Sequence, residues 1–231
     1  MKALILAAGR GERMRPLTDH TPKPLLQVRG KPLIVWHLEA LARDGIREVV
    51  INTAWLEERI VEALGDGSRH GVAIRYSLEG RDHGGALETA GGIAKALPLL
   101  TDATNDCFWV VSGDVFLPGF RFDPAAAQRF AQGRALAHLW LVPNAPHHPE
   151  GDFGLDAQGL ASRTATPKRT WASVGLFRNT IVRDVKVGDK LPLTPLLRAG
   201  ADAGRIEATA YDGPWTDVGT VERLNALNGE A

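Results

Sequence analysis

The chain has 231 residues, and its 27 Lys and Arg residues balance its 27 Asp and Glu residues, so its net charge indicates neither a nucleic-acid nor a membrane partner. Hydrophobic residues make up 44% and charged residues 23%, as in soluble globular proteins. The single cysteine, Cys107, excludes an internal disulfide framework, and no apolar run reaches the roughly 20 residues of a membrane-spanning helix. We therefore expect a cytoplasmic protein with a single domain over 1–231.

The first 140 residues alternate between two hydrophobic patterns. Short continuous apolar runs are typical of buried parallel strands, whereas apolar residues spaced three or four apart are typical of helices. Because strands that alternate with helices return to one sheet through right-handed crossovers, this order predicts a doubly wound, mostly parallel α/β sheet. The expected strands are 2–7, 48–52, 72–77, 108–112 and 136–142, and the expected helices are 32–44, 55–64, 89–97 (stopped near Pro98) and 124–133.

The remaining residues are less regular. Residues 143–170 are rich in Pro, His, Gly, Asp and Thr, which predicts a hairpin or lid on the same domain rather than a linker between two domains. Strands are expected at 171–177 and 206–211, and helices at 194–203 and 221–228.

A loop rich in glycine and arginine follows the first strand. Gly9 and Gly11 allow backbone N–H groups to approach a phosphate chain closely, while Arg13 and Lys23 supply a forked cation and a point charge. Residues 1–31 carry seven basic and two acidic side chains, an excess that suits a small anion. The loop lacks the third glycine of a dinucleotide-binding fingerprint, where Met14 stands, and it lacks the Gly-Lys-Ser/Thr of a P-loop.

This loop, Gly-x-Gly-x-Arg-x-x-Pro-x-Thr followed by Pro-Lys-Pro-Leu, resembles the signature of the sugar-1-phosphate nucleotidyltransferases. The resemblance implies a Rossmann-like nucleotidyltransferase fold and an enzyme that joins a sugar 1-phosphate to a nucleoside triphosphate, UTP in our prediction. It also implies that Arg13 and Lys23 are catalytic and that both bind the nucleotide together with Ala8, Gly9 and Gly11.

Three later segments are similar to the same family in the same order. Leu-Glu-Thr-Ala-Gly at 87–91 resembles a segment that contacts the base, with Glu88 where the family usually has glycine. Asp114 ends Val-Ser-Gly-Asp, and Asp217 lies in Trp-Thr-Asp-Val-Gly-Thr. The resemblance implies that these two aspartates hold Mg²⁺, an ion that prefers carboxylates, phosphate oxygens and water.

The segment 142–155 is similar to the Asn-Pro-x-His-x-Pro-x-Gly-Asp-Phe segment of N-acetylmuramate α-1-phosphate uridylyltransferases, which recycle cell-wall sugar. The resemblance implies that Asn144, Asp152 and Gly154 bind the sugar, that 1–140 form the nucleotide-binding half and that 141–231 form the sugar-binding half. His147 and His148 have no third ligand nearby in the sequence, so we expect no metal site there.

Several alternatives stay open at this point. The base could be thymine or guanine, and the sugar could be glucose, mannose or a heptose. The usual Glu-Lys-Pro segment that holds the sugar phosphate is missing, and Arg163 or Lys168 stands in that region. The alternative from another class is a non-catalytic sensor that binds a nucleotide sugar. The presence of the four charged residues Arg13, Lys23, Asp114 and Asp217 argues against a sensor, which would not need them all. Oligomeric state has no signature in the sequence.

Overall fold

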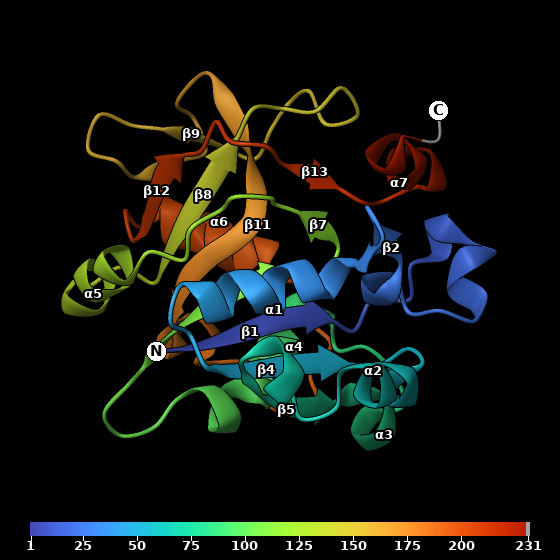
Figure 1. Cartoon of the computed structure of the whole chain (residues 1–231). Coiled ribbons are helices and arrows are strands. Elements are labelled where there is room, and N and C mark those ends of the chain that lie inside the picture. Colours follow the sequence, from blue (N-terminus) through green and yellow to red (C-terminus); the bar gives the residue numbers. More distant parts are fainter. Residues whose placement is uncertain (230–231) are drawn as a thin grey trace.

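The computed structural model describes residues 1–229, which fold around one large twisted sheet (Figure 1). Its centre is the predicted parallel sheet, in which neighbouring strands follow the order β6, β1, β4, β5. These strands are β1 (Lys2–Ala7), β4 (Glu48–Thr53), β5 (Ala73–Leu78) and β6 (Cys107–Ser112). Within the described residues, no helix is long and apolar enough to cross a membrane.

The second half of the chain extends this sheet through one long strand of the opposite direction, beyond which β8 and β12 run in the direction of the core strands again. The long strand β11 (Lys168–Arg178) pairs antiparallel with β6 on one side and with β8 (Ala137–Val142) on the other. Strand β12 (Ile206–Ala210) then joins β8 in parallel. The short strands β9 (Phe153–Leu155) and β10 (Ala161–Ser162) form the predicted hairpin over the end of β11.

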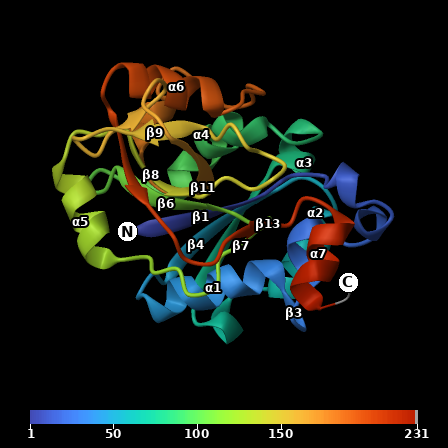
Figure 2. The same ribbon diagram turned by 90° about the horizontal axis from the view of Figure 1, so that it is seen from above.

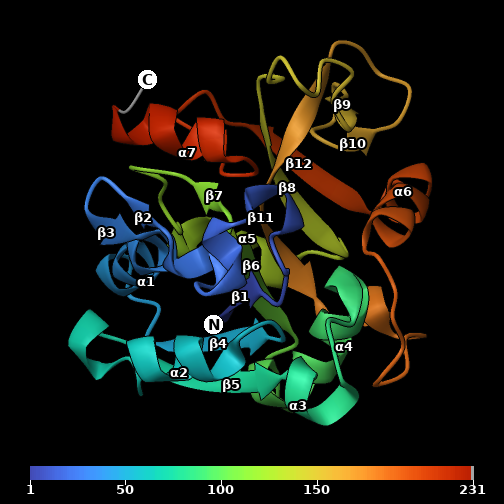
Figure 3. The same ribbon diagram turned by 90° about the vertical axis from the view of Figure 1, so that its right-hand side faces the viewer.

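Helices cover both faces of the sheet, as Figures 2 and 3 show. Neighbouring residues of β1 point to opposite faces, so Ile5 lies in the core beneath α1 and Leu4 in the core beneath α4. The first layer contains α1 (Leu33–Arg43), α2 (Glu57–Leu64) and α5 (Pro124–Gln132), and the second contains α4 (Glu88–Leu100) and α6 (Thr194–Asp202).

The predicted doubly wound architecture is confirmed, with two local differences. Helix α4 does not stop near Pro98 but continues to Leu100, because the Leu100 side chain is fully buried in the second core layer. A short helix, α3 (Glu79–His83), had no periodic signal because it is barely longer than one turn.

The carboxyl-terminal residues return to the first loop of the chain. Strand β13 (Thr216–Asp217) pairs antiparallel with β7 (Val115–Phe116), which directly follows β6. The predicted helix α7 (Val221–Asn228) then packs beside β2 (Gln27–Val28), which pairs with β3 (Lys31–Pro32). A small third core joins these parts, formed by Met14, Leu26, Val28, Leu33, Phe116, Val218 and Leu224.

Candidate active site

The glycine loop leaves β1 at the edge where the parallel strands end and continues as three single-turn 3₁₀ helices, Glu12–Met14, Leu17–Asp19 and Lys23–Leu25. Gly11 adopts φ +68°, a left-handed conformation that favours glycine. Its carbonyl accepts a hydrogen bond of 2.8 Å from Thr18 Oγ1, and a Cβ at Gly11 would lie 3.0 Å from the Thr18 methyl group. The loop is therefore folded back on itself and held in one shape.

Two adjoining cavities open beside this loop. The larger, of about 430 Å³, is lined by Ala8, Gly9, Lys23, Glu88 and Asp114 among others. The second, of about 310 Å³, shares Gly9, Lys23 and Asp114 and adds Gly11, Arg13 and Gly219. The structure therefore brings together all six residues that the sequence assigned to the nucleotide: Ala8, Gly9, Gly11, Arg13, Lys23 and Glu88.

Lys23 and Asp114 form the charged centre of these cavities. Lys23 Nζ lies 2.6 Å from Asp114 Oδ2, and Ser112 Oγ donates to Asp114 Oδ1 at 2.6 Å. Burial acts to raise the pKa of Asp114, but the Lys23 charge and these hydrogen bonds outweigh it and hold the pKa below its ordinary value. Asp114 is therefore a carboxylate at neutral pH.

A buried histidine supports the strand that follows Asp114. The His37 side chain of α1 donates from Nε2 to the Val115 carbonyl of β7 at 2.8 Å. Burial lowers the pKa of His37 to about 4, against weaker opposing effects of this hydrogen bond and of Asp114. His37 is thus neutral near pH 7, and its hydrogen bond holds the Val115 backbone in place next to Asp114.

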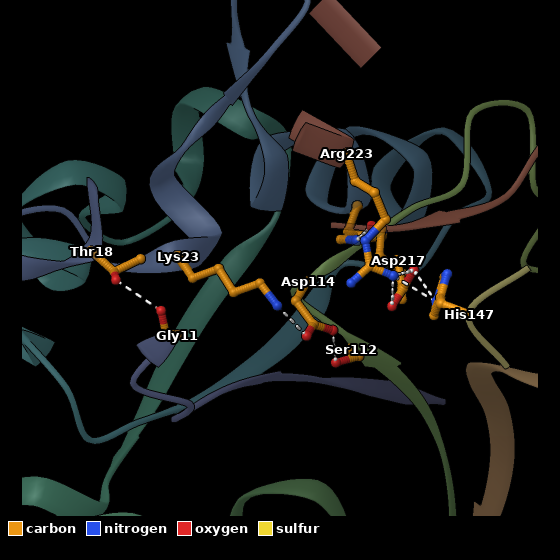
Figure 4. A network of polar contacts seen from close by, with 10 residues as sticks. Gly11, Thr18, Lys23, Ser112, Asp114, His147, Asp217 and Arg223 are labelled. Atoms are coloured by element: carbon orange, nitrogen blue, oxygen red, sulfur yellow. Dashed lines mark hydrogen bonds and ion pairs between the residues drawn. The ribbon is translucent and has the colours of Figure 1, made fainter. Parts of the chain in front are cut away.

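The second predicted metal ligand, Asp217, lies on the strand beside Asp114. Asp217 pairs with Val115, the residue after Asp114, and the Val218 amide donates to the Asp114 carbonyl at 2.8 Å. The two aspartates are therefore neighbours at one end of the β7–β13 pair. Arg223 Nη1 donates to both Asp217 carboxylate oxygens, at 2.6 and 2.8 Å, and His147 Nε2 lies 3.1 Å from Asp217 Oδ1. Figure 4 shows Lys23 reaching Asp114 from one side and Arg223 and His147 meeting Asp217 on the other.

Asp114 and Asp217 are the two carboxylates here that could hold a metal ion. Among residues 1–229, no three His, Cys, Asp or Glu side chains gather as a ready-made metal site. Asp114, just before β7, and Asp217, in β13, are nonetheless two hard carboxylates beside a loop suited to phosphate, each paired here with a cation, Lys23 or Arg223. Mg²⁺ typically takes one or two carboxylates and fills the rest of its shell with phosphate oxygens and water.

A buried polar relay, which the sequence did not reveal, supports the predicted base-binding end. Asn52 Oδ1 accepts from the Ala7 amide at 2.9 Å, and Asn52 Nδ2 donates to Glu79 Oε1 at 2.6 Å. Glu79 Oε2 accepts from the Leu87 amide at 2.8 Å. Burial raises the pKa of Glu79 despite these hydrogen bonds. The relay ties the end of β1 to the turn that begins α4.

That turn contains the residue that departs from the family pattern. Glu88 adopts φ +60°, the left-handed region in which glycine is the common residue. The family pattern usually has glycine at this position, and the positive φ shows why glycine suits it. Glu88 is exposed and lines the larger cavity.

The predicted sugar-binding residues lie in the hairpin, where hydrogen bonds within the hairpin engage the two polar side chains. Asn144 Nδ2 donates to the carbonyls of Pro149 and Lys168, at 2.8 and 3.0 Å, and Asn144 Oδ1 accepts from Thr170 at 2.9 Å. Asp152 Oδ2 accepts from the Trp171 amide at 2.8 Å, and its Oδ1 lies 3.2 Å from His148.

Gly154 pairs with β10 and β11, and a Cβ there would lie 2.1 Å from the Ala165 carbonyl oxygen. Gly154, Asn144 and Asp152 therefore determine the shape of the hairpin, and none of the three lines the two cavities beside the glycine loop.

The two basic residues considered for the sugar phosphate also lie outside those cavities. Arg163 forms a salt bridge of 2.7 Å with Asp202, and Lys168 is half-buried in β11 next to the hairpin. Sequence reasoning missed a different lysine, Lys190, which lines the larger cavity. It also missed Arg223, whose position four residues after Gly219 in the Trp-Thr-Asp-Val-Gly-Thr segment was the available signal.

Comparison with known sequences shows which proteins the chain is similar to. A family described as "Nucleotidyl transferase" matches residues 2–230. The chain is 49% identical over 229 residues to N-acetylmuramate alpha-1-phosphate uridylyltransferase of Neisseria meningitidis serogroup B, covering 97% of this chain and 95% of that protein. It is 31% identical over 228 residues to the enzyme of the same name from Caulobacter vibrioides, covering 94% and 91%.

Solved structures support the fold. A structure from Bacillus anthracis, solved in complex with a sucrose, matches with a TM-score of 0.82 at 22% identity, covering 99% of this chain and 94% of that one. HddC from Yersinia pseudotuberculosis matches with a TM-score of 0.75 at 17% identity, covering 99% and 98%.

Proposed function

The chain belongs to the nucleotidyl transferase family, and on that basis we propose that it joins UTP to N-acetylmuramic acid α-1-phosphate, giving the UDP-sugar and pyrophosphate. It is an enzyme that acts on small molecules, a sugar 1-phosphate and a nucleoside triphosphate. The observation that carries the choice of sugar and base is the 49% identity, over 97% of the chain, to a uridylyltransferase for this substrate. The same likeness favours catalysis over the sensor alternative.

The reaction is a direct displacement at phosphorus. An oxygen of the sugar phosphate attacks the α-phosphorus of UTP, the bond to the β-phosphate oxygen breaks, and pyrophosphate leaves with that electron pair. The sugar phosphate is already an anion, so no side chain needs to remove a proton. Positioning and charge neutralisation are then the contributions of the protein.

The site residues suit these two contributions. We assign the backbone at Ala8, Gly9 and Gly11 to the triphosphate, because their loop is held rigidly at the edge of the sheet. Lys23 lies in both cavities and can neutralise the α-phosphate, and Arg13 in the second cavity can grip the departing pyrophosphate.

We also assign Asp114 and Asp217 to Mg²⁺, which when bound would offset phosphate charge. Glu88 is assigned to the base end of the cavity. Asn144, Asp152 and Gly154 are assigned to shaping the sugar-binding hairpin. We further place the reaction in the recycling of cell-wall sugar in the cytoplasm, where UTP is made.

The test is pyrophosphate release from UTP and Mg²⁺ with three substrates: the 1-phosphates of N-acetylmuramic acid, N-acetylglucosamine and glucose. We expect a strong preference for the muramic substrate and loss of turnover when EDTA removes the metal. A preference for another sugar, or for dTTP or GTP in place of UTP, would contradict the proposed substrates. Full activity in EDTA would contradict the metal assignment.

A further inference from the structure

The segment that follows β11 is fastened to the first turn of α4. The Leu191 amide donates to the Leu87 carbonyl at 3.0 Å, and the Leu191 carbonyl accepts from the Ala90 amide at 2.9 Å. A Cβ at Gly91 would lie 2.1 Å from the Asp189 carbonyl oxygen, so only glycine permits this close approach. In Figure 3 this orange segment runs beside α4. Residues 189–191 therefore have a fixed position at the mouth of the larger cavity.

Of residues 141–229, Lys190 alone lines this cavity. Every other lining residue lies between Leu6 and Asp114, in the half assigned to the nucleotide. Lys190 is exposed, and among residues 1–229 it forms no salt bridge. The other two cations that line the cavity are engaged, since Lys23 pairs with Asp114 and Arg10 stacks 4.4 Å over the Trp55 ring. Lys190 thus offers an ammonium group without a charged partner.

The proposed sugar carries a negative charge that most sugar 1-phosphates lack. N-acetylmuramic acid is N-acetylglucosamine with a lactic acid joined through an ether oxygen, so its 1-phosphate has a carboxylate in addition to the phosphate. The glycine loop, Arg13 and Lys23 supply donors for the phosphate groups on the wall formed by residues 6–24. The carboxylate needs a cation from another wall, because a carboxylate removed from water without one is costly.

We propose that Lys190 binds the lactyl carboxylate and is the residue that selects the muramic substrate over N-acetylglucosamine 1-phosphate. This inference rests on the proposed function and adds the residue that distinguishes the two sugar 1-phosphates. Lys190 reaches the cavity from residues 141–231, the half of the chain that we assign to the sugar. The hydrogen bonds of Leu191 hold its backbone in place, so a change of the Lys190 side chain leaves the segment docked.

The experiment compares Lys190→Met, Lys190→Arg and the unchanged enzyme on the muramic and glucosamine 1-phosphates, with UTP titrated separately. We expect Lys190→Met to lower the ratio of the two kcat/KM values by roughly 10- to 100-fold, the usual size of one lost charge-assisted hydrogen bond. The loss should appear as a higher KM for the muramic substrate, while Lys190→Arg keeps most of the preference because it keeps the charge.

Lys186→Met is the matched control, because Lys186 is an exposed lysine of the same segment that does not line the cavity. It should leave the ratio unchanged. A ratio that stays the same in Lys190→Met would overturn the inference, and so would a rise in KM for UTP or an equal loss with both sugars, which would place Lys190 on a phosphate. A failure of the proposed function is recognised separately, because the unchanged enzyme would then show no preference for the muramic substrate.

Discussion

The glycine-loop wall and the hairpin use their polar groups in opposite ways. At the glycine loop, backbone amides and the cations Arg13 and Lys23 line cavities, and the supporting hydrogen bonds lie behind them. In the hairpin, Asn144 and Asp152 direct their polar atoms inward, to the backbone of their own strands. The first region presents its charged groups to a ligand, whereas the second uses them to hold its own shape.

The largest expected effect is the loss of turnover when Lys23 or Asp114, the charged centre of the two cavities, is replaced. Lys23→Ala and Asp114→Ala should each lower kcat by about 10²–10³-fold while the protein stays folded, as loss of a charge-stabilising group usually does. Steady-state kinetics and circular dichroism measure the two properties. Lys31→Ala is the control, because Lys31 pairs with Glu39 away from the cavities. Near-normal turnover in both variants would show that Lys23 and Asp114 do not take part in the reaction.

The next effect tests whether the hairpin is a scaffold. Asn144→Ala removes three hydrogen bonds and should lower the free energy of unfolding by about 1–3 kcal/mol, because carbonyl groups of the hairpin lose their donor. Urea unfolding measures the change, and KM for UTP should stay constant. Unchanged stability together with a higher KM for the sugar would show instead that the amide of Asn144 faces the substrate.

A smaller effect concerns His37, the buried histidine next to Asp114, and the pH dependence of the free energy of unfolding. The pKa of His37 is about 4 in the fold against 6.5 in the unfolded chain, so between these values the unfolded chain binds more protons. This contribution to stability is complete above pH 6.5 and decreases as the pH falls toward 4, by at most about 1.4 kcal/mol per pH unit. His37→Gln keeps a donor but cannot titrate, so its unfolding free energy should depend less on pH in this window. An identical pH profile for both proteins would assign the acid sensitivity to other groups.

The smallest effect concerns the strained turn of the nucleotide half. Glu88→Gly should raise the free energy of unfolding by up to about 1 kcal/mol, because glycine adopts φ +60° without steric cost but loses more chain entropy on folding. Glu88→Ala is the control, since it removes the carboxylate and keeps the strain. A similar loss of UTP affinity in both variants would show that the carboxylate contacts the nucleotide, whereas a stability gain shared by both would exclude strain as the cause.

The sequence predicted best what local patterns determine. The parallel core, the hairpin and helix α7 followed from hydrophobic spacing and turn residues, and the clustering of Lys23 with Asp114 followed from motif order. It could not predict that Asn144 bonds within the hairpin, because a motif names a residue type and not the partner of each polar atom. The Asn52–Glu79 relay was hidden for a related reason. Its three parts are separated along the chain and meet only when β1, β4 and α3 are assembled.

The third small core unites the two ends of the described chain. Met14 of the glycine loop is packed with Val218 and Leu224, so the loop cannot rearrange without disturbing β13 and α7. Coupling between two equilibria is reciprocal, so any ligand that orders the loop stabilises the carboxyl-terminal helix by the same free energy by which that helix favours the ligand. Amide hydrogen exchange in α7, far from any phosphate along the sequence, should therefore slow when nucleotide binds.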